Sequence, residues 1–313
     1  MKFYLDHTPP VLPLGLSHKD KIMLTGSCFS ENIGLRLQKY HFNCLNNPDG
    51  ILFNPISIAR SLTETLRPQP LAENEIVTRH DHFFSLHHHS SVYAGNREDL
   101  KLLIEKNRQS AFDFIRSASC LFISFGSAHA YQRLQSHQVV ANCHKQPASG
   151  FKKILLTPPE IVTVYNPLIE ELLAVNPHLK IVFTVSPVKY LKDGIVENNL
   201  SKASLLWSVH EITSANKNCF YFPAYELLND DLRDYRFYKE DLAHPNEMAI
   251  SYIWDKLVQS VFSATSREVI ELLKKLFQAR EHRPLHLNDD PALAAFIERQ
   301  RTEILKLAPG LPV

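Results

Sequence analysis

The stretch KIMLTGSCFSEN, residues 21–32, decides the fold of this chain. Its apolar first half predicts a buried strand of a parallel sheet over Ile22–Thr25. Its second half is rich in small and polar residues, and a helix with Ser30 as its N-cap is predicted to follow as far as Tyr40. A buried strand that leads directly into a helix is the repeating unit of an α/β fold.

The same alternation of strand and helix continues along the chain. Apolar runs predict further strands at 120–125, 181–185 and 219–222. Helices are predicted in the intervals, at 56–66, from 97 onward, at 158–176, at 201–213 and from Pro245 to Phe262. The pattern predicts a three-layer α/β/α sandwich with a mostly parallel central sheet. Ligands bind such sheets outside the carboxyl ends of the strands, where Ser27, Gly126 and Ser186 are expected.

The sequence also predicts how the chain divides. Residues 1–265 are expected to form the α/β domain, and the polar, histidine-rich segment 67–96 is expected to be an insertion of short strands and loops. A hairpin is predicted at 132–142. Residues 266–313 are predicted to form a helical C-terminal extension of two amphipathic helices.

Composition indicates an ordinary soluble globule of 313 residues, 44% hydrophobic and 21% charged. A net charge of +1 does not favour nucleic acid or an acidic membrane surface as a partner. Five cysteines at irregular spacing do not form a disulfide framework. The N-terminus has no secretory signal and no stretch has the roughly 18 apolar residues of a membrane helix, so a cytoplasmic location is expected.

A serine near the start of the chain and an Asp–His pair near its end suggest nucleophilic catalysis. A hydrolytic serine needs a base that takes its proton and a carboxylate that orients the base. Ser27 ends the first predicted strand, and Asp241 and His244 lie three residues apart near the end of the chain. In a tight turn this spacing lets both side chains face one pocket, and a neutral imidazole accepts a proton at physiological pH. In the alternative interpretation Ser27 caps the helix, Asp241 caps a turn and His244 is exposed.

Several motifs resemble those of a known family. They are GSCF at 26–29, NPDGILFNP at 47–55, NCHK at 142–145, TVSPV at 184–188, ENNLSK at 197–202, DYRFY at 234–238 and the Asp241-x-x-His244 pair. In this order they resemble the GSCFA family, a branch of the SGNH/GDSL-type esterase superfamily, with Ser30 where the family name has alanine. The resemblance runs from about Lys21 to about Leu257 and leaves the tail after Ser266 unmatched. It implies an SGNH-hydrolase-like α/β/α hydrolase whose natural substrate is poorly defined.

The resemblance further implies an oxyanion hole, to which many superfamily members contribute a glycine N–H and an asparagine side chain. The segment 126–129, GSAH, falls where the superfamily has Gly-x-Asn-Asp, but the asparagine is absent. Groups expected to bind the oxyanion or the substrate are the N–H of Ser27 or Cys28, together with Gly50, Gly126, Ser127, Asn142 and His144. Losing one donor typically costs ~10²–10³ in rate, so a replacement for the asparagine is expected in a fast enzyme.

Cys143 and His144 offer a competing chemistry, because a cysteine beside a histidine suggests a thiol nucleophile. Neighbouring residues on an extended segment point to opposite faces, so His144 is not expected to serve Cys143. Structural packing of Cys143 and a place for His144 in the pocket lining are favoured. The Cys28 side chain is expected in the core.

A run of histidines suggests a metal cluster: His80, His82, His87, His88 and His89. Consecutive histidines on a strand alternate faces, however, and no CxxC or HExxH motif accompanies them. A surface or pocket-rim role is therefore predicted, and no metal or organic cofactor is expected.

The function predicted from these patterns is that of a serine esterase with Ser27, His244 and Asp241 as its catalytic residues. Analogy with the superfamily suggests an O-acyl ester of a carbohydrate or another small polar molecule as substrate. Acyl transfer by the same residues stays open, and so does a non-catalytic carbohydrate-binding protein on the same fold. The absent asparagine supports the last alternative.

Overall fold

The computed structural model describes residues 5, 7–281 and 291–313. Its central sheet contains β1 (Lys21–Gly26), β2 (Asn43–Asn46), β6 (Cys120–Phe125), β10 (Lys180–Val185) and β11 (Cys219–Tyr221). The strands lie in the order β11-β10-β6-β1-β2, and every neighbouring pair is parallel. The order in which the chain adds strands reverses between β1 and β6, and such a point is where parallel sheets of this kind bind ligands.

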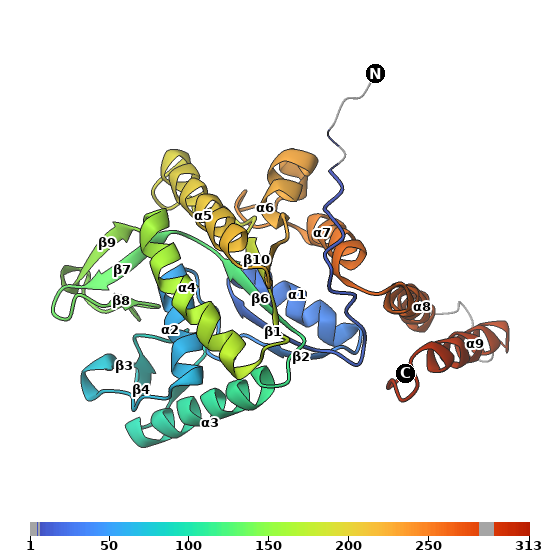
Figure 1. Cartoon of the computed structure of the whole chain (residues 1–313), viewed down its shortest axis with the longest axis horizontal. Helices are drawn as coiled ribbons and strands as arrows, with labels where there is room; N and C mark the ends of the chain where they lie inside the picture. The colour runs from blue at the N-terminus through green and yellow to red at the C-terminus, as the bar shows by residue number, and fades with distance from the viewer. Residues whose placement is uncertain (1–4, 6, 282–290) are drawn as a thin grey trace.

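Helices cover both faces of this sheet (Figure 1). On one face lie α1 (Cys28–Lys39), α7 (Glu247–Val261) and α8 (Ala264–Glu281). On the other face lie α2 (Pro55–Leu66), α3 (Arg97–Ile115), α4 (Pro158–Val175) and α5 (Ile195–Ala215). Alternate strand residues face the two layers, so Leu24 joins the first core and Met23 the second. The predicted three-layer α/β/α fold class is confirmed.

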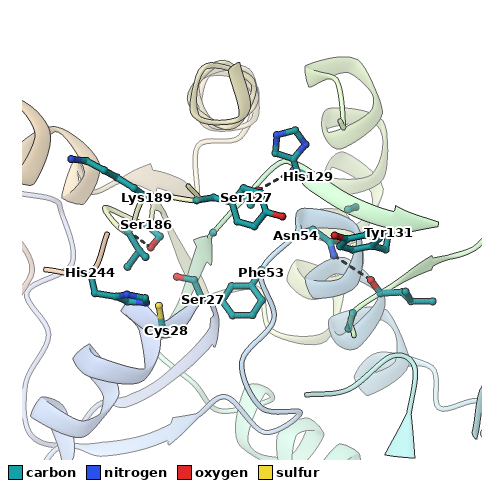
Figure 2. Close-up of a pocket in the computed structure, with 16 residues that line it drawn as sticks. Ser27, Cys28, Phe53, Asn54, Ser127, His129, Tyr131, Ser186, Lys189 and His244 are labelled. Carbon is teal, nitrogen blue, oxygen red and sulfur yellow. Dashed lines mark hydrogen bonds between the residues drawn. The ribbon is translucent and has the colours of Figure 1, made fainter. Parts of the chain in front are cut away.

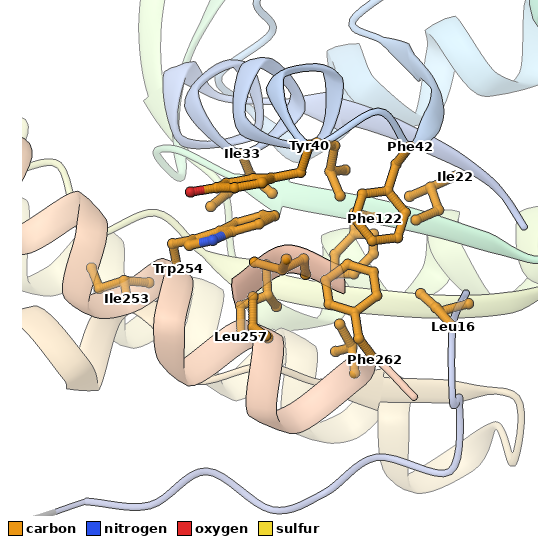
Figure 3. Close-up of a cluster of buried hydrophobic side chains, with 14 of the residues drawn as sticks. Leu16, Ile22, Ile33, Tyr40, Phe42, Phe122, Ile253, Trp254, Leu257 and Phe262 are labelled. Atoms are coloured by element: carbon orange, nitrogen blue, oxygen red, sulfur yellow. The ribbon is translucent and has the colours of Figure 1, made fainter. Parts of the chain in front are cut away.

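Aromatic side chains fasten α7 to the sheet and to α1 (Figure 3). The rings of Tyr40 and Trp254 stack with centroids 5.4 Å apart, and those of Phe42 and Phe262 lie 4.6 Å apart. Burying each such side chain contributes roughly 1.5–3 kcal/mol. Because α7 begins just after the Asp241–His244 segment, this packing fixes the end of that segment.

Two helices, α8 and α9 (Pro291–Leu307), follow the part of the chain that resembles the GSCFA family. In α8, Val269 and Leu273 are fully buried in the first core. The last helix, α9, contacts α8 and adds Ile304 to the same core, while residues 282–290 between them lie outside the described residues. The predicted helices are present, and the predicted domain boundary at 265 stays a prediction. Within the described residues no helix has both the length and the apolar character that a bilayer crossing requires.

Two small antiparallel sheets lie beside the carboxyl ends of the central strands. One holds β3 (Ile76–Arg79), β4 (His82–Ser85) and β5 (Tyr93–Ala94), and the other holds β7 (His129–Arg133), β8 (Val139–Val140) and β9 (Phe151–Leu155). The two are joined where the N–H of Ala141 donates to the carbonyl of Leu86 at 2.8 Å. Short helical turns complete the chain: η1 (Glu73–Glu75), η2 (Ala148–Gly150), α6 (Ala224–Glu226), the π-helical η3 (Leu227–Leu232) and η4 (Tyr235–Phe237).

Several predicted boundaries were wrong. The N-cap of α1 is Ser27, because the Ser30 hydroxyl donates to the carbonyl of Thr25 instead. Helix α7 is capped by Asn246, whose side chain accepts the N–H of Ala249, so it begins after Pro245.

Three further elements were missed or misplaced. Helix α5 starts six residues before the predicted Ser201, at Ile195. The edge strand β2 was missed because its sequence, NCLN, carries no apolar run. The antiparallel strand β9, with two lysines among its five residues, was missed for the same reason.

Gly26 allows the end of β1 to lie directly against the backbone of β6. Its φ of 129° is a conformation that favours glycine, and a Cβ there would lie 2.2 Å from the Ser124 carbonyl oxygen. The Gly26 N–H donates to the Asn47 side chain at 2.9 Å, and the next N–H, that of Ser27, donates to the Ser124 carbonyl at 3.0 Å. Any side chain at Gly26 would push Ser27 out of place.

We expect Gly26→Ala to lower the free energy of unfolding by about 3 kcal/mol or more, because it adds both backbone strain and a clash with backbone atoms. Gly95→Ala is the matched control, since nothing lies within 4 Å of a Cβ at Gly95. Urea denaturation of the two variants provides the measurement. Equal stabilities would contradict the close approach of β1 and β6.

Buried histidines predict a loss of stability in mild acid. Burial lowers the pKa of His18 to about 4, and it also lowers the pKa values of His88 and His144. In unfolded chains histidine titrates near 6.5, so between about pH 4 and 6.5 the unfolded state binds more protons and the free energy of unfolding falls as the pH falls. We expect Tm to be several degrees lower at pH 5 than at pH 7.5.

His18→Phe is the control variant for this dependence, because phenylalanine can keep the stacking on Phe42, whose ring lies 4.0 Å from that of His18. It loses two hydrogen bonds of the imidazole, so its Tm is lower at every pH, but the fall between pH 7.5 and 5 should be smaller. A wild-type Tm that does not change over this range would contradict the assignment of neutral buried histidines.

Candidate active site

A cavity of about 310 Å³ opens at the carboxyl ends of β1, β6 and β10 (Figure 2). Ser27, Gly126 and Ser186, which follow these three strands, line it, and His244 reaches it from the loop before α7. The sheet topology therefore brings residues from distant parts of the sequence to one place. The cavity lies at the reversal point between β1 and β6.

Ser27 lies at the N-terminus of α1 and is 1% exposed. Its hydroxyl accepts the Phe29 N–H at 3.3 Å and lies 2.8 Å from the Ser124 hydroxyl. The capping role considered in the sequence analysis is therefore real, and it leaves Ser27 in the cavity wall as well. The helix N-terminus favours negative charge near this oxygen.

The segment 237–246 is a tight loop held by its own backbone. The Lys239 N–H donates to the His244 carbonyl at 2.8 Å, and the Asn246 N–H donates to the Phe237 carbonyl at 2.9 Å. At its tip Leu242 has a φ of 56°, which lets the chain reverse between Asp241 and His244.

Asp241 and His244 form a hydrogen-bonded pair within this loop. His244 Nδ1 lies 2.6 Å from Asp241 Oδ2, while Asp241 Oδ1 accepts the N–H groups of Ala243 and His244 at 3.0 and 2.9 Å. These two N–H groups, and then the imidazole, lower the pKa of Asp241 to about 2. The ionised carboxylate accepts a hydrogen bond from Nδ1–H, so a neutral His244 carries its lone pair on Nε2. Figure 2 shows the ring turned toward Ser27 and Cys28.

Ser27 and His244 share the cavity without a direct hydrogen bond. In the part of the chain that the structure describes, the hydrogen bonds of the Ser27 hydroxyl go to Ser124 and Phe29. Catalytic hydrogen bonds are often loose in ligand-free structures and tighten in the complex. The arrangement places a hydroxyl and an oriented imidazole around one space.

Most of the N–H groups expected to stabilise an oxyanion already donate to carbonyl groups of the protein. The N–H groups of Gly126 and Ser127 both donate to the Phe53 carbonyl, at 2.8 and 3.0 Å. The N–H of Ser27 donates to Ser124, as described above. Among the hydrogen bonds of the described residues, the N–H of Cys28 has no acceptor, as is usual in the first turn of a helix. Cys28 lines the cavity, so this N–H is the best-placed backbone donor.

Asn54 is a cavity residue that sequence reasoning missed, although it ends the NPDGILFNP motif. Its side chain caps α2 by accepting the Ser57 N–H at 2.8 Å, and its amide nitrogen lies 3.5 Å from the Val140 carbonyl. An asparagine before a proline at a helix start is a signal for a cap, and nothing in that signal points to a cavity.

Three residues that sequence reasoning assigned to the site lie outside the cavity wall: Gly50, Asn142 and His144. The Gly50 N–H donates to the Asn47 carbonyl at 2.8 Å. The Asn142 side chain accepts the His144 N–H, and His144 is buried with Nε2 2.8 Å from the Ser85 carbonyl. His144 has a φ of 46°, in the left-handed region.

The thiols near the site are poorly suited to act as nucleophiles. Burial raises the pKa of Cys28, which lines the cavity, and also that of Cys143, which does not. A raised pKa lowers the fraction of reactive thiolate. His144 is engaged with Ser85, so it does not activate Cys143.

The histidines between positions 80 and 89 were predicted to lie on the surface or the pocket rim. This prediction was wrong for His87 and His88. His87 and His88 are 6% and 2% exposed, since His87 Nε2 lies 3.1 Å from Glu75 and His88 Nδ1 lies 2.9 Å from the Ser85 hydroxyl. Each of these buried imidazoles therefore has one ring nitrogen in a hydrogen bond to another protein side chain. Within the described ranges no three His, Cys, Asp or Glu side chains are grouped so that they could hold a metal ion.

Lys202 is a buried lysine beneath the cavity that sequence reasoning missed. It is 1% exposed, and its Nζ donates to the carbonyls of Gly126 and Ser186 at 2.7 and 2.6 Å. Burial lowers its pKa to about 7. The lysine ties together the two loops that follow β6 and β10. Lys202 ends the ENNLSK motif at 197–202, but nothing in that motif indicates that its side chain is buried.

A polar groove of about 360 Å³ adjoins the cavity, and Lys189 lines both. Lys189 Nζ lies 3.9 Å from the ring centroid of Tyr238 and 5.2 Å from that of Tyr235. Its backbone N–H donates to the Ala243 carbonyl at 3.1 Å, which ties the groove to the His244 loop. The remaining groove residues are Asn229, Asp230, Arg233 and Asp234.

Comparison with known proteins supports the resemblance seen in the sequence. No curated protein matches the chain. Among solved structures it is similar to a carbohydrate esterase family 3 from Talaromyces cellulolyticus, with 9% identity and a TM-score of 0.39 over 82% of this chain and 99% of that one. It is also similar to a family two carbohydrate esterase from Clostridium thermocellum in complex with cellohexaose, with 12% identity and a TM-score of 0.40 over 87% and 67% of the two chains. The model of the GSCFA family matches residues 21–257, well over half of the sequence, and the protein therefore belongs to that family.

Proposed function

We propose that the protein is a serine esterase in which Ser27 is the nucleophile, His244 the base and Asp241 the carboxylate that orients it. The observation that carries the proposal is the shared cavity: Ser27 and His244 line it together, while Asp241 holds Nδ1 of His244 at 2.6 Å. A nucleophile, a base and an orienting group in one accessible space are the components of acyl transfer.

The reaction begins when the Ser27 side chain rotates from Ser124 toward His244. Nε2 accepts the hydroxyl proton as the oxygen attacks the ester carbonyl, and the N–H of Cys28 at the start of α1 stabilises the oxyanion that forms. The imidazolium then protonates the departing alcohol. Water, activated by the same imidazole, releases the acid from Ser27, and another alcohol in place of water would make the protein an acyltransferase.

The alcohol part of the substrate is a carbohydrate or another small polar molecule. The leaving oxygen must lie beside His244, and the polar groove reaches that loop through Lys189. Tyr235 is 65% exposed there, and it lies near Asp230 and Arg233 in the groove wall. An exposed aromatic face beside charged hydrogen-bonding groups suits a polyhydroxylated ligand.

A non-catalytic binding protein is the second candidate. The observation that favours it is the engagement of the Ser27 hydroxyl with Ser124 and Phe29, together with the commitment of the Gly126 and Ser127 N–H groups to Phe53. In that case the cavity and groove would bind a ligand without turnover. Reactivity of Ser27 separates the two candidates.

We expect a fluorophosphonate probe to label Ser27 and the protein to hydrolyse short-chain p-nitrophenyl esters. Ser27→Ala and His244→Ala should lose labelling, and kcat should fall by about 10⁴-fold or more. Asp241→Asn should lower kcat by about 10⁴-fold because the amide can donate to Nδ1 and favour the tautomer whose proton is on Nε2. Peptide mapping of the labelled protein and steady-state kinetics provide the measurements.

Cys143→Ser is the matched control in this experiment, because Cys143 lies outside the cavity wall. It should label and turn over like the wild type. Turnover that survives Ser27→Ala but is lost in Cys143→Ser would replace the serine mechanism with a thiol one. A wild-type protein that neither labels nor hydrolyses esters would support the binding protein.

We also expect Lys202→Met to lower kcat/KM by about tenfold or more. It leaves the carbonyls of Gly126 and Ser186 unpaired, each at a cost of about 1–3 kcal/mol, and releases two loops of the cavity wall. Leu273→Ala in α8 is the control, since it costs a comparable ~2–5 kcal/mol away from the cavity. Kinetics at 20 °C should show the loss only in Lys202→Met, and equal activity of the two variants would make Lys202 a purely structural residue.

A further inference from the structure

The cavity continues beyond Ser27 as an apolar arm. The arm is lined by Phe53, Ala130, Tyr131, Val140 and Ala141, which come from the segment before α2 and from the hairpin of β7 and β8. Figure 2 shows Ser27 and Phe53 between His244 and Tyr131, so the arm leads away from the imidazole. It is therefore separate from the polar groove beside Lys189.

The proposed chemistry decides which part of an ester enters the arm. His244 must contact the oxygen of the departing alcohol in order to protonate it, so the alcohol lies on the His244 side of Ser27. The carbonyl carbon lies at the Ser27 oxygen, and the acyl group extends on the opposite side. The arm is the space on that side.

The polar side chains in and beside the wall of the arm have partners in the protein. The Tyr131 hydroxyl accepts from Lys192 Nζ at 3.1 Å, and His129 Nε2 lies 3.3 Å from the Glu197 carbonyl. The Asn54 side chain binds the Ser57 N–H and the Val140 carbonyl. The Ser127 hydroxyl accepts the His129 N–H at 3.0 Å and lies 3.2 Å from the Ser201 hydroxyl. A hydrogen-bonding ligand gains little in such a space, whereas an alkyl chain displaces water from apolar surface.

The size of the cavity also exceeds what a small acyl group needs. At roughly 30 Å³ for a water-sized group, the volume of about 310 Å³ holds about ten such groups. An acetyl group supplies only three heavy atoms. This volume covers the whole cavity, including the side that the departing alcohol occupies, and it exceeds the volume of an acetyl group several-fold.

We propose that the arm binds a medium-chain acyl group of about six carbons, so that the substrate is a medium-chain ester of a polar alcohol and not an acetate. This proposal rests on the proposed serine esterase function. Each methylene group that is buried changes an equilibrium constant by about fourfold. A hexanoyl chain has four more methylene groups than an acetyl group, and each can be buried in the arm.

The first test compares kcat/KM of the wild-type protein for p-nitrophenyl acetate, butyrate, hexanoate and octanoate. The value for hexanoate should exceed that for acetate by about tenfold or more. A wild-type protein that hydrolyses acetate at least as efficiently as hexanoate overturns the proposal while leaving the esterase function intact.

The second test fills the arm with Ala141→Leu. Ala141 lines the arm and is itself half-buried. The hexanoate-to-acetate ratio should fall to about one. Ala203→Leu, on the exposed face of α5, adds the same side chain outside the cavity and should keep the wild-type ratio. A ratio that is the same in Ala141→Leu and in the wild type overturns the proposal.

A binding measurement separates this inference from the function it rests on. Calorimetry with Ser27→Ala should show that the free carboxylate hexanoate binds at least about tenfold more tightly than free acetate. Adding Ala141→Leu to the Ser27→Ala variant should remove this difference in affinity. Hexanoate binding without ester turnover in the wild type would refute the esterase but keep the apolar arm. Equal affinity for the two acids would refute the arm whether or not the wild type is an enzyme.

Discussion

The contact between β1 and β6 at Gly26 is the constraint on which the site depends. Because no side chain stands there, the β1 backbone approaches β6 closely enough for the Ser27 N–H to donate to the Ser124 carbonyl. That bond sets the first residue of α1, and with it the position of the Ser27 oxygen at the cavity. A hydroxyl placed by a backbone hydrogen bond does not depend on the flexibility of a long side chain.

The imidazole reaches the same cavity through a chain of backbone contacts and not through a bond to Ser27. The His244 loop is tied to the loop after β10 by the Lys189 N–H, and Lys202 ties that loop to Gly126 after β6. The loops around the cavity thus hold one another at the level of the main chain. Burying the amino group of Lys202 is costly in an apolar interior, and its hydrogen bonds to two carbonyls offset that cost.

The sequence predicted those parts of the fold that carry a local signal. Buried strands such as β6 and β10 are continuous apolar runs, whereas the edge strand β2 is polar and depends on its pairing with β1. The catalytic hypothesis used local cues as well, a strand-to-helix turn and an Asp-x-x-His spacing. The placement of His144 was not predictable in this way, because its burial against Ser85 arises from contact between two small sheets. Lys202 was missed for the same reason, since both of its partners come from distant loops.

A second set of the same residue types shows which features of the first one the proposed reaction depends on. His88 has the Ser85 hydroxyl 2.9 Å from Nδ1 and Asp49 3.7 Å from Nε2, so a serine, a histidine and an aspartate adjoin there too. All three are buried and both imidazole nitrogens face protein groups, so neither a substrate nor a free nitrogen is at hand. In the Ser27 set the carboxylate binds Nδ1 and leaves Nε2 toward an open cavity. Access and the orientation of one nitrogen, more than residue identity, distinguish a site that is able to react from a hydrogen-bonded core.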